Sequence, residues 1–274
     1  MDTQHALARA TLSSGKALRL ARISDPATRR AHIVPMDHSV TVGPLGPVDH
    51  TERMVSLLAR TGINAVVLHR GRINHVPVDA FSSIGLIVHL SAGTSLSLDT
   101  DAKVLVSSVE AAVRSGADAV SIHVNIGSHS ERQQLADFAT VARECEALGV
   151  PLLAMMYARG PQQSGPSSAA TLAHLAAIAT DLGADMIKLD YAGSPAAMQA
   201  VVASTPVPVY VAGGPTISDD AAIALGAEIM SSGVAGLSFG RNVFDASSPV
   251  RVASALARIV HQRIGDTERV AALA

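Results

Sequence analysis

Residues 118–157, DAVSIHVNIGSHSERQQLADFATVARECEALGVPLLAMMY, hold one complete unit of the pattern that decides the fold. Two short apolar runs, 118–124 and 151–157, are rich in the aliphatic residues that buried parallel strands favour. Between them, residues 131–148 place apolar side chains at helical spacing and are followed by Gly149, a residue type that often ends helices. The stretch therefore predicts a strand, a helix and a second strand parallel to the first.

The same unit recurs along most of the chain, about every 25–35 residues. Strands are expected at 32–37, 64–69, 85–90, 118–124, 151–157, 185–189, 207–212 and 234–239. Helices are expected at 49–60, 102–115, 131–148, 167–182 and 219–231, with terminating glycines at Gly62, Gly116, Gly149, Gly183 and Gly233. Eight such units favour a closed α/β structure, a (β/α)8 TIM barrel, over an open sheet. A dinucleotide-binding fold would have a glycine-rich fingerprint after the first strand, where Met36-Asp37-His38 stands instead.

We expect one catalytic barrel domain over residues 32–274. It is preceded by an N-terminal extension at 1–31, which we expect to pack on the barrel or on a neighbouring subunit. A Pro-, Gly- and Ser-rich loop at 160–168 follows the fifth strand and could be a flap over the site or an inert surface loop.

The composition excludes several classes of protein. With 274 residues, 48% of them hydrophobic, the chain can bury the core of one large domain. A net charge of −2 argues against a nucleic-acid partner, which would need a basic face. The single cysteine, Cys145, excludes an internal disulfide and fits a reducing compartment. Without a leader sequence or an apolar run of ~20 residues, we expect a cytoplasmic protein and no membrane partner.

Lys188 is the first candidate for chemistry, because the chain has only three lysines. It lies late in the predicted strand Asp185-Met186-Ile187-Lys188-Leu189-Asp190, where side chains alternate between the two faces. If Ile187 and Leu189 meet the outer helices, then Lys188 points into the barrel. Burial favours the neutral amine, which attacks carbonyls to form an imine. The alternative is a structural ion pair with Asp37 or Asp190.

Two further residues at strand ends are candidates for proton transfer. Tyr157 ends the fifth strand, next to the strand of Lys188, and a phenol there can move a proton to or from a substrate hydroxyl. Asp37 ends the first strand and could be an acid/base or the partner of the lysine. As alternatives, Tyr157 could be a core tyrosine and Asp37 a cap for the following turn.

Histidines gather at strand ends, where they could bind a metal or the substrate. They are His38, His69, His89 and His123. Because they come from different strands without a supporting carboxylate pattern, we expect no metal. Hydrogen bonds to substrate, from His38 and His123 in particular, or neutral packing are the preferred interpretation.

The loops after the seventh and eighth strands predict a phosphate site. Gly213 and Gly214 follow one strand, and Gly240 and Arg241 follow the other. Glycines at these two loops let backbone N–H groups approach an anion, and the arginine adds a positive charge. We also include two residues after the sixth strand among the substrate-binding candidates, namely Asp190 and Gly193.

These residues together resemble the DhnA-type (archaeal-type) class I fructose-bisphosphate aldolase family, from about residue 33 to 261. The ordered matches are Pro35-Met36-Asp37-His38, Val66-Val67-Leu68-His69-Arg70-Gly71, Gly85-Leu86-Ile87-Val88-His89-Leu90-Ser91, Ser121-Ile122-His123-Val124-Asn125, Met155-Met156-Tyr157, Lys188, Val211-Ala212-Gly213-Gly214 and Gly240-Arg241-Asn242. The resemblance implies a metal-free barrel without a cofactor. It also implies a Schiff-base lysine matching Lys188, a proton-transferring tyrosine matching Tyr157 and an acid/base aspartate matching Asp37. Related barrels form rings of subunits, often decamers, so we expect a homo-oligomer.

Within the family, residues 85–94 look closer to the 2-amino-3,7-dideoxy-D-threo-hept-6-ulosonate synthase branch than to the sugar-splitting aldolases. That branch joins a phosphorylated ketose fragment to L-aspartate 4-semialdehyde. A related bacterial 2-amino-4,5-dihydroxy-6-oxo-7-(phosphonooxy)heptanoate synthase, of grixazone-type pathways, joins dihydroxyacetone phosphate to the same aldehyde. The Lys-poor, Ala- and Arg-rich composition is typical of a high-GC bacterium and favours this last activity, with a phosphorylated ketose and an aldehyde as partners.

Three departures from the family pattern concern the acceptor. Ala158 stands where the family usually has Pro, Ser39 where glycine is common, and Leu189-Asp190 where small or hydroxyl residues are usual. A carboxylate at Asp190 could pair with Lys188 or bind the amino group of an amino-aldehyde. Two rival hypotheses stay open at this point: a metal-dependent lyase or isomerase using His69, His89 and His123, and a catalytically silent barrel that acts as a binding subunit.

Overall fold

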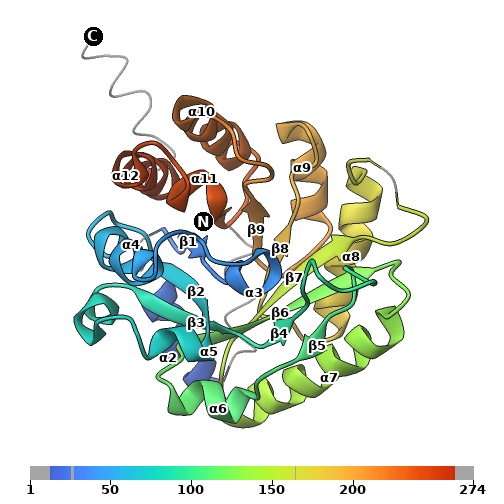
Figure 1. Ribbon diagram of the computed structural model, residues 1–274. Helices are drawn as coiled ribbons and strands as arrows, with labels where there is room; N and C mark the ends of the chain where they lie inside the picture. Colours follow the sequence, from blue (N-terminus) through green and yellow to red (C-terminus); the bar gives the residue numbers. More distant parts are fainter. Residues whose placement is uncertain (1–12, 26–27, 164, 263–274) are drawn as a thin grey trace.

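Eight parallel strands close into a barrel in the computed structural model, which describes residues 13–25, 28–163 and 165–262 (Figure 1). The strands are β1 (Ala31–Pro35), β2 (Ala65–His69), β3 (Gly85–His89), β6 (Ala119–Ile126), β7 (Leu152–Ala158), β8 (Met186–Leu189), β9 (Val209–Ala212) and β10 (Gly236–Ser238). They follow the order β1, β10, β9, β8, β7, β6, β3, β2, and the pairing of β2 with β1 closes the ring. The predicted TIM barrel is confirmed, and each predicted strand overlaps an observed one.

Helices form the outer layer of the barrel in Figure 1. The main ones are α4 (His50–Leu58), α6 (Val109–Arg114), α7 (Glu131–Leu148), α8 (Ala169–Asp181), α9 (Pro195–Ala203), α10 (Asp219–Met230) and α12 (Pro249–His261). The five glycines expected to end helices all have positive φ, between 62° at Gly149 and 92° at Gly183, a conformation that glycine adopts without the strain of a side chain. Among the described residues, no helix has both the length and the apolar character needed to cross a membrane.

The helix predicted at 102–115 is wrong in its first half. Helix α6 begins only at Val109, after Ser108, whose side chain accepts a hydrogen bond from the N–H of Ala111 (3.2 Å). The residues before it form β5 (Val104–Leu105), which pairs antiparallel with β4 (Ser91–Ala92). The β-branched run around β5 favours an extended backbone. The result is a hairpin that extends β3 at the mouth of the barrel.

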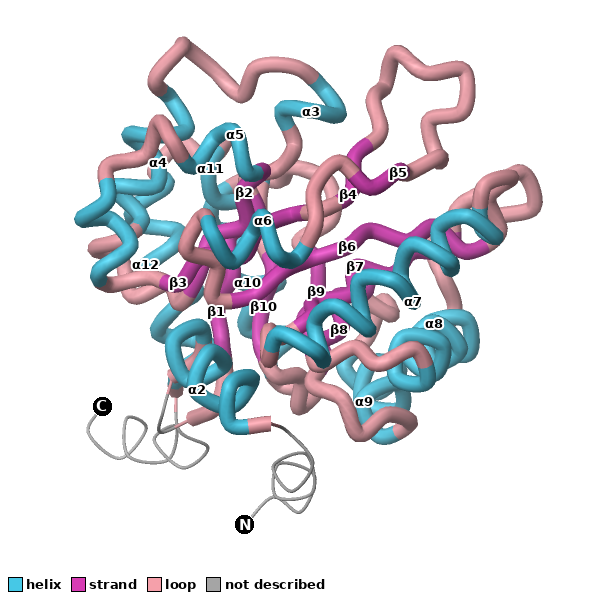
Figure 2. Tube along the Cα trace, turned by 90° about the horizontal axis from the view of Figure 1, so that it is seen from below, coloured by secondary structure: helices cyan, strands magenta, loops and turns pink. Residues whose placement is uncertain are grey.

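Helix α2 (Ser14–Ile23) covers the opposite end of the barrel. The Lys16 ammonium binds Glu146 (2.8 Å) and Asp185 (3.1 Å), and Asp185 lies directly before β8. Ile23 is buried and joins the cluster of apolar side chains inside the barrel. In Figure 2, α2 lies on one side of the molecule, while the β4–β5 hairpin and α3 (Ser39–Val42) lie on the other. Residues 1–12 and 26–27 of the expected extension, and 263–274 of the expected barrel domain, are outside the described residues.

The alternation of side chains along β8 follows the prediction. Met186 belongs to the cluster inside the barrel, whereas Ile187 and Leu189 pack in the outer layer against the helices. Lys188 is in register with Met155 on one side and with Tyr210 on the other. Both of these neighbours belong to the inner cluster, so Lys188 also points into the barrel. It is 6% exposed.

A buried histidine on β1 makes the fold sensitive to acid. His32 lies between Ala31 and Ile33, which point inward, so its side chain faces outward and lies fully buried between β1 and the helix layer that includes α12. Burial, with a smaller contribution from the charge of His261, lowers the pKa of His32 to about 3. The usual value in an unfolded chain is about 6.5. Between these two pH values the unfolded chain binds a proton that the folded protein does not bind.

We therefore expect the free energy of unfolding to decrease as the pH falls from about 6.5 toward 3, because protonation favours the unfolded chain in this window. At pH 5 the contribution of His32 is about 2 kcal/mol relative to pH 7. Urea unfolding of the His32→Leu variant at both pH values should show a pH dependence weaker by that amount. The exposed His174 on α8 is the matched control, and His174→Leu should keep the wild-type dependence. Equal pH dependence in the wild type and His32→Leu would contradict the assignment.

Candidate active site

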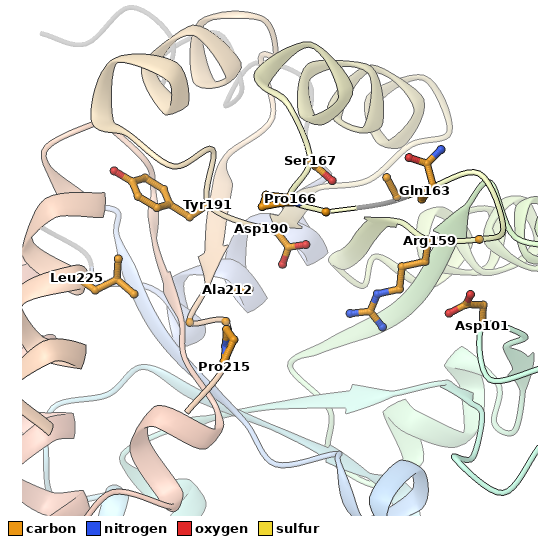
Figure 3. A pocket seen from close by; sticks show the side chains of 15 residues that line it. Asp101, Arg159, Gln163, Pro166, Ser167, Asp190, Tyr191, Ala212, Pro215 and Leu225 are labelled. Atoms are coloured by element: carbon orange, nitrogen blue, oxygen red, sulfur yellow. The ribbon is translucent and has the colours of Figure 1, made fainter. Parts of the chain in front are cut away.

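A cavity of about 610 Å³ opens at the carboxyl ends of β7, β8 and β9 (Figure 3). Its walls come from the loops that follow these strands, and Figure 3 labels the side chains of Arg159, Asp190 and Pro215 in it. The backbone of Gly213 and Gly214 forms part of the same lining. Active sites of TIM barrels lie at this end of the strands. The predicted site residues are therefore expected near this end of the barrel, in contact with the cavity or with one another.

Lys188 lies in the barrel interior close to the mouth, near two carboxylates but bonded to neither. Its positive charge helps to hold the pKa of Asp37 below its ordinary value, and it partly opposes the burial that raises the pKa of Asp190. Among the residues that the structure describes, however, no ion pair within 4.0 Å and no hydrogen bond involves its amine. The predicted alternative, a structural ion pair with Asp37 or Asp190, is thus not observed in this part of the chain. A buried amine without a fixed partner is available to react with a bound carbonyl group.

Asp37 lies between two imidazoles. Its carboxylate oxygens are 3.7 Å from His89 Nε2 and 3.8 Å from His38 Nδ1. Burial acts to raise the pKa of Asp37, but the positive charges of His89 and His38, which are protonated in acid, and of Lys188 outweigh it and hold the pKa below its ordinary value. Asp37 is therefore ionised at neutral pH, where it can orient a cation or accept a proton from a group bound beside it.

His89 is a neutral hydrogen-bonding residue rather than a cation. Its ring is buried, and burial lowers its pKa to about 4 although Asp37 acts in the opposite direction. Nδ1 is 2.8 Å from Ser121 Oγ, and Nε2 faces Asp37. His69 contacts it edge to face, with 5.2 Å between ring centroids. Neutral imidazoles of this kind can donate one hydrogen bond to a carboxylate or to a substrate oxygen.

Tyr157 is 7% exposed and lies between His123 and Arg159. The His123 ring is 4.7 Å from the Tyr157 ring, centroid to centroid, and its Nε2 is 2.8 Å from Asn125 Oδ1. Burial lowers the pKa of His123 well below its usual value, so it is neutral. The Arg159 guanidinium also stacks on the Tyr157 ring, with Cζ 4.4 Å from the ring centroid. These contacts fix the phenol next to β8, where it can exchange a proton with a molecule bound to Lys188.

The loops after β9 and β10 meet as predicted, and Asn242 joins them. Its Nδ2 donates hydrogen bonds to the carbonyl oxygens of Gly213 (2.7 Å) and Pro215 (3.1 Å). Arg241 Nη2 donates to the Gly214 carbonyl (3.3 Å). A Cβ on Gly213 would come within 2.9 Å of the Phe239 ring, so this close approach requires glycine.

Gly240 is equally confined, because a Cβ there would be 2.7 Å from the Pro35 carbonyl oxygen and 2.9 Å from His38 Cε1. The predicted phosphate loop is thereby brought against the end of β1, next to Asp37. Gly193, in contrast, lies in the loop after β8 with φ 83° and is not part of the cavity lining. Gly240 is not part of that lining either, although it lies against the end of β1 beside His38.

The predicted histidines divide into two groups instead of forming one centre. His38, His69 and His89 surround Asp37, while His123 contacts Tyr157. Within the described ranges, no set of three or more His, Cys, Asp or Glu residues has an arrangement that could hold a metal ion. Their contacts are with the Asp37 carboxylate, hydroxyl groups, amides, aromatic rings and one another.

Arg159 and Asn242 are the site residues that the sequence analysis did not select. Arg159 is two positions after Tyr157, so the rule of alternating side chains that selected Tyr157 also directs Arg159 toward the mouth. No sequence signal revealed that Asn242 would join two loops, because its partners are backbone carbonyls 27 and 29 residues away.

Comparisons with known proteins agree with this geometry. The model of a family described as DeoC/LacD family aldolase matches residues 31–246. The chain is 47% identical over 247 residues to the 2-amino-4,5-dihydroxy-6-oxo-7-(phosphonooxy)heptanoate synthase of Streptomyces griseus, covering 90% of both proteins. It is 42% identical to 2-amino-3,7-dideoxy-D-threo-hept-6-ulosonate synthase 1 of Archaeoglobus fulgidus, covering 90% of this chain and 91% of that one.

A solved structure of a Schiff-base-forming fructose-1,6-bisphosphate aldolase matches with a TM-score of 0.82 and 28% identity. The match covers 90% of this chain and 100% of the other. The family resemblance inferred from the ordered motifs is confirmed. The chain belongs to the DeoC/LacD aldolase family and is a class I aldolase, an enzyme that works through a lysine Schiff base.

Proposed function

We propose that this aldolase joins dihydroxyacetone phosphate to L-aspartate 4-semialdehyde, with Lys188 as the Schiff-base residue. The observation that carries the proposal is the inward-facing Lys188 amine, 6% exposed and without a bonded partner among the described residues. The cavity that Asp190 lines, two residues beyond Lys188, combines a glycine-rich loop suited to a phosphate with charged side chains suited to a polar aldehyde. The compound in the name of the Streptomyces griseus relative is the product that this pair of substrates would give, which supports the proposal.

The reaction begins with the donor. The Lys188 amine attacks the ketone of dihydroxyacetone phosphate, water leaves, and a protonated imine forms. Loss of a proton from the neighbouring hydroxymethyl carbon gives an enamine, in which the imine has served as the electron sink. Asp37, ionised and close to Lys188, is the group proposed to assist proton transfer at this stage. Gly213, Gly214, Gly240 and Arg241 are proposed to hold the phosphate.

The enamine carbon then attacks the aldehyde carbon and forms the new carbon–carbon bond. The aldehyde oxygen becomes a hydroxyl group by taking a proton, which we assign to the Tyr157 phenol. Water hydrolyses the imine and releases the free amine together with 2-amino-4,5-dihydroxy-6-oxo-7-(phosphonooxy)heptanoate. No oxidant, reductant or cofactor is needed for this sequence of steps.

A second candidate is a transaldolase-type reaction, in which a longer phosphorylated ketose supplies the donor fragment. The Archaeoglobus fulgidus relative, named as a 2-amino-3,7-dideoxy-D-threo-hept-6-ulosonate synthase, favours it. Both candidates use the same lysine and the same aldehyde. They differ in which ketone becomes bound to Lys188, so the identity of the trapped donor distinguishes them.

We expect borohydride to trap dihydroxyacetone phosphate on the protein, with the added mass on the peptide that contains Lys188. The Lys188→Met variant should lose the adduct and at least about 10³-fold in turnover. Lys103→Arg, the matched control at another buried lysine, should keep the adduct. Adding aspartate semialdehyde to the wild type should give the seven-carbon product by mass. An adduct only with a longer ketose phosphate would favour the second candidate, and no adduct with any ketone would overturn the role of Lys188.

We expect Tyr157→Phe to retain the trapped donor but to lower turnover by about 10²–10⁴-fold, because the variant keeps the ring contacts and loses only the proton of the phenol. Stopped-flow measurement of carbon–carbon bond formation, beside borohydride trapping on the same sample, separates the two steps. Tyr210→Phe is the control, since Tyr210 is also buried inside the barrel and in register with Lys188. Wild-type turnover in Tyr157→Phe would show that another group supplies the proton.

A further inference from the structure

Two opposite charges face the same cavity from neighbouring strands. Arg159 follows β7 and Asp190 follows β8, and Figure 3 shows both side chains directed into the cavity. Arg159 is exposed to solvent, and Asp190 is partly buried. The two groups lie close enough to interact, since burial raises the pKa of Asp190 and the charge of Arg159 opposes that rise. Yet neither side chain forms a hydrogen bond or an ion pair within 4.0 Å, as far as the described residues show.

A carboxylate and a guanidinium that are close but unpaired are suited to a ligand carrying both charges. The α-ammonium and α-carboxylate of an amino acid form such a pair on one carbon atom. The guanidinium binds carboxylates through two parallel hydrogen bonds, and a carboxylate accepts hydrogen bonds from an ammonium group. Burial raises the pKa of Asp190, while the charges of Arg159 and Lys188 lower it. A bound ammonium would add a further positive charge and favour the ionised carboxylate.

The position of Arg159 also places the Arg159–Asp190 pair near Tyr157, the residue proposed to transfer a proton. Its guanidinium stacks 4.4 Å from the centroid of the Tyr157 ring. A carboxylate bound to Arg159 therefore holds the rest of the molecule near the phenol proposed to protonate the aldehyde oxygen. The glycine loop proposed to hold the donor phosphate, Gly213 and Gly214, lines the same cavity. Donor and acceptor would thus share one cavity with their reactive carbons between its walls.

Asp101 is a second acidic residue in the cavity lining, and it is the less suitable partner for an ammonium. Its charge acts on Lys103, one of the buried lysines, whereas Asp190 interacts electrostatically with both Arg159 and Lys188. Asp190 is also two residues beyond Lys188 on the same chain segment, which places it beside the proposed reaction centre.

We propose that Arg159 and Asp190 bind the amino-acid end of the acceptor aldehyde, Arg159 through its carboxylate and Asp190 through its ammonium group, and that Asp190 thereby selects amino-aldehydes over aldehydes that lack the amino group. This assignment rests on the proposed function and identifies which residues recognise the acceptor.

The test compares two aldehydes that differ only in the amino group, L-aspartate 4-semialdehyde and succinate semialdehyde, with dihydroxyacetone phosphate as donor. In Asp190→Asn we expect KM for the amino-aldehyde to rise about 10–100-fold while KM for succinate semialdehyde changes less than about 3-fold. Arg159→Met should raise KM for both aldehydes, since both carry the carboxylate, and Arg159→Lys should recover part of the loss. Asp101→Asn, the matched acidic control, should keep the wild-type preference. Borohydride trapping of the donor on Lys188 should persist in every variant.

A binding measurement tests the roles of Arg159 and Asp190 without requiring that the enzyme catalyse the proposed reaction. By calorimetry, the wild type should bind L-homoserine at least about 10-fold more tightly than 4-hydroxybutyrate, and Asp190→Asn should remove the difference. Neither alcohol can form an imine, so this outcome stands even if no donor is trapped. Loss of donor trapping in Asp190→Asn would show that Asp190 serves Lys188. An equal effect on both aldehydes, or an unchanged KM in Arg159→Met, would also overturn the assignment.

Discussion

The alternation of side chains along a closed ring of parallel strands is the constraint on which the rest of this structure depends. Each strand offers the barrel interior only every second residue, and most of these positions are filled by aliphatic side chains. A polar residue at an inward position near the carboxyl end of its strand therefore has few possible neighbours. Lys188 is such a residue, and its register partners Met155 and Tyr210 cannot neutralise its charge.

The isolation of the Lys188 charge determines the electrostatics at the carboxyl end of the barrel. A lysine in an apolar interior is costly unless charges nearby compensate it, and here Asp37 and Asp190 lie close enough to feel its charge without forming an ion pair. The histidines around Asp37 are kept neutral by burial, so they add hydrogen-bonding groups without adding positive charge. The site combines a buried amine, the ionised Asp37 carboxylate and several neutral rings, a set suited to moving protons around a carbonyl carbon.

Much of this could be read from the sequence, because strand periodicity and side-chain parity are local properties. They predicted all eight strands, the glycines at helix ends and the inward direction of Lys188. The features that the sequence did not predict depend on contacts between segments that are far apart in the chain. The β4–β5 hairpin, which replaced half of a predicted helix, is stabilised by the antiparallel pairing of Ser91 with Leu105 and of Ala92 with Val104, residues that lie on either side of a long loop. The role of Asn242 likewise depends on carbonyl groups of another loop.

Asn242 has a consequence for how this catalyst could diversify. By bonding Gly213 and Pro215 it couples the loops after β9 and β10 into one rigid unit. The opposite wall, with Arg159 and Asp190, contains side chains that no such bond restrains among the described residues. Under the proposed assignment, substitutions on that wall would alter which aldehyde binds and would leave the hydrogen bonds between the glycine loops in place. The two walls of the cavity can therefore change independently, and laboratory evolution toward new acceptors would begin with the residues that follow β7 and β8.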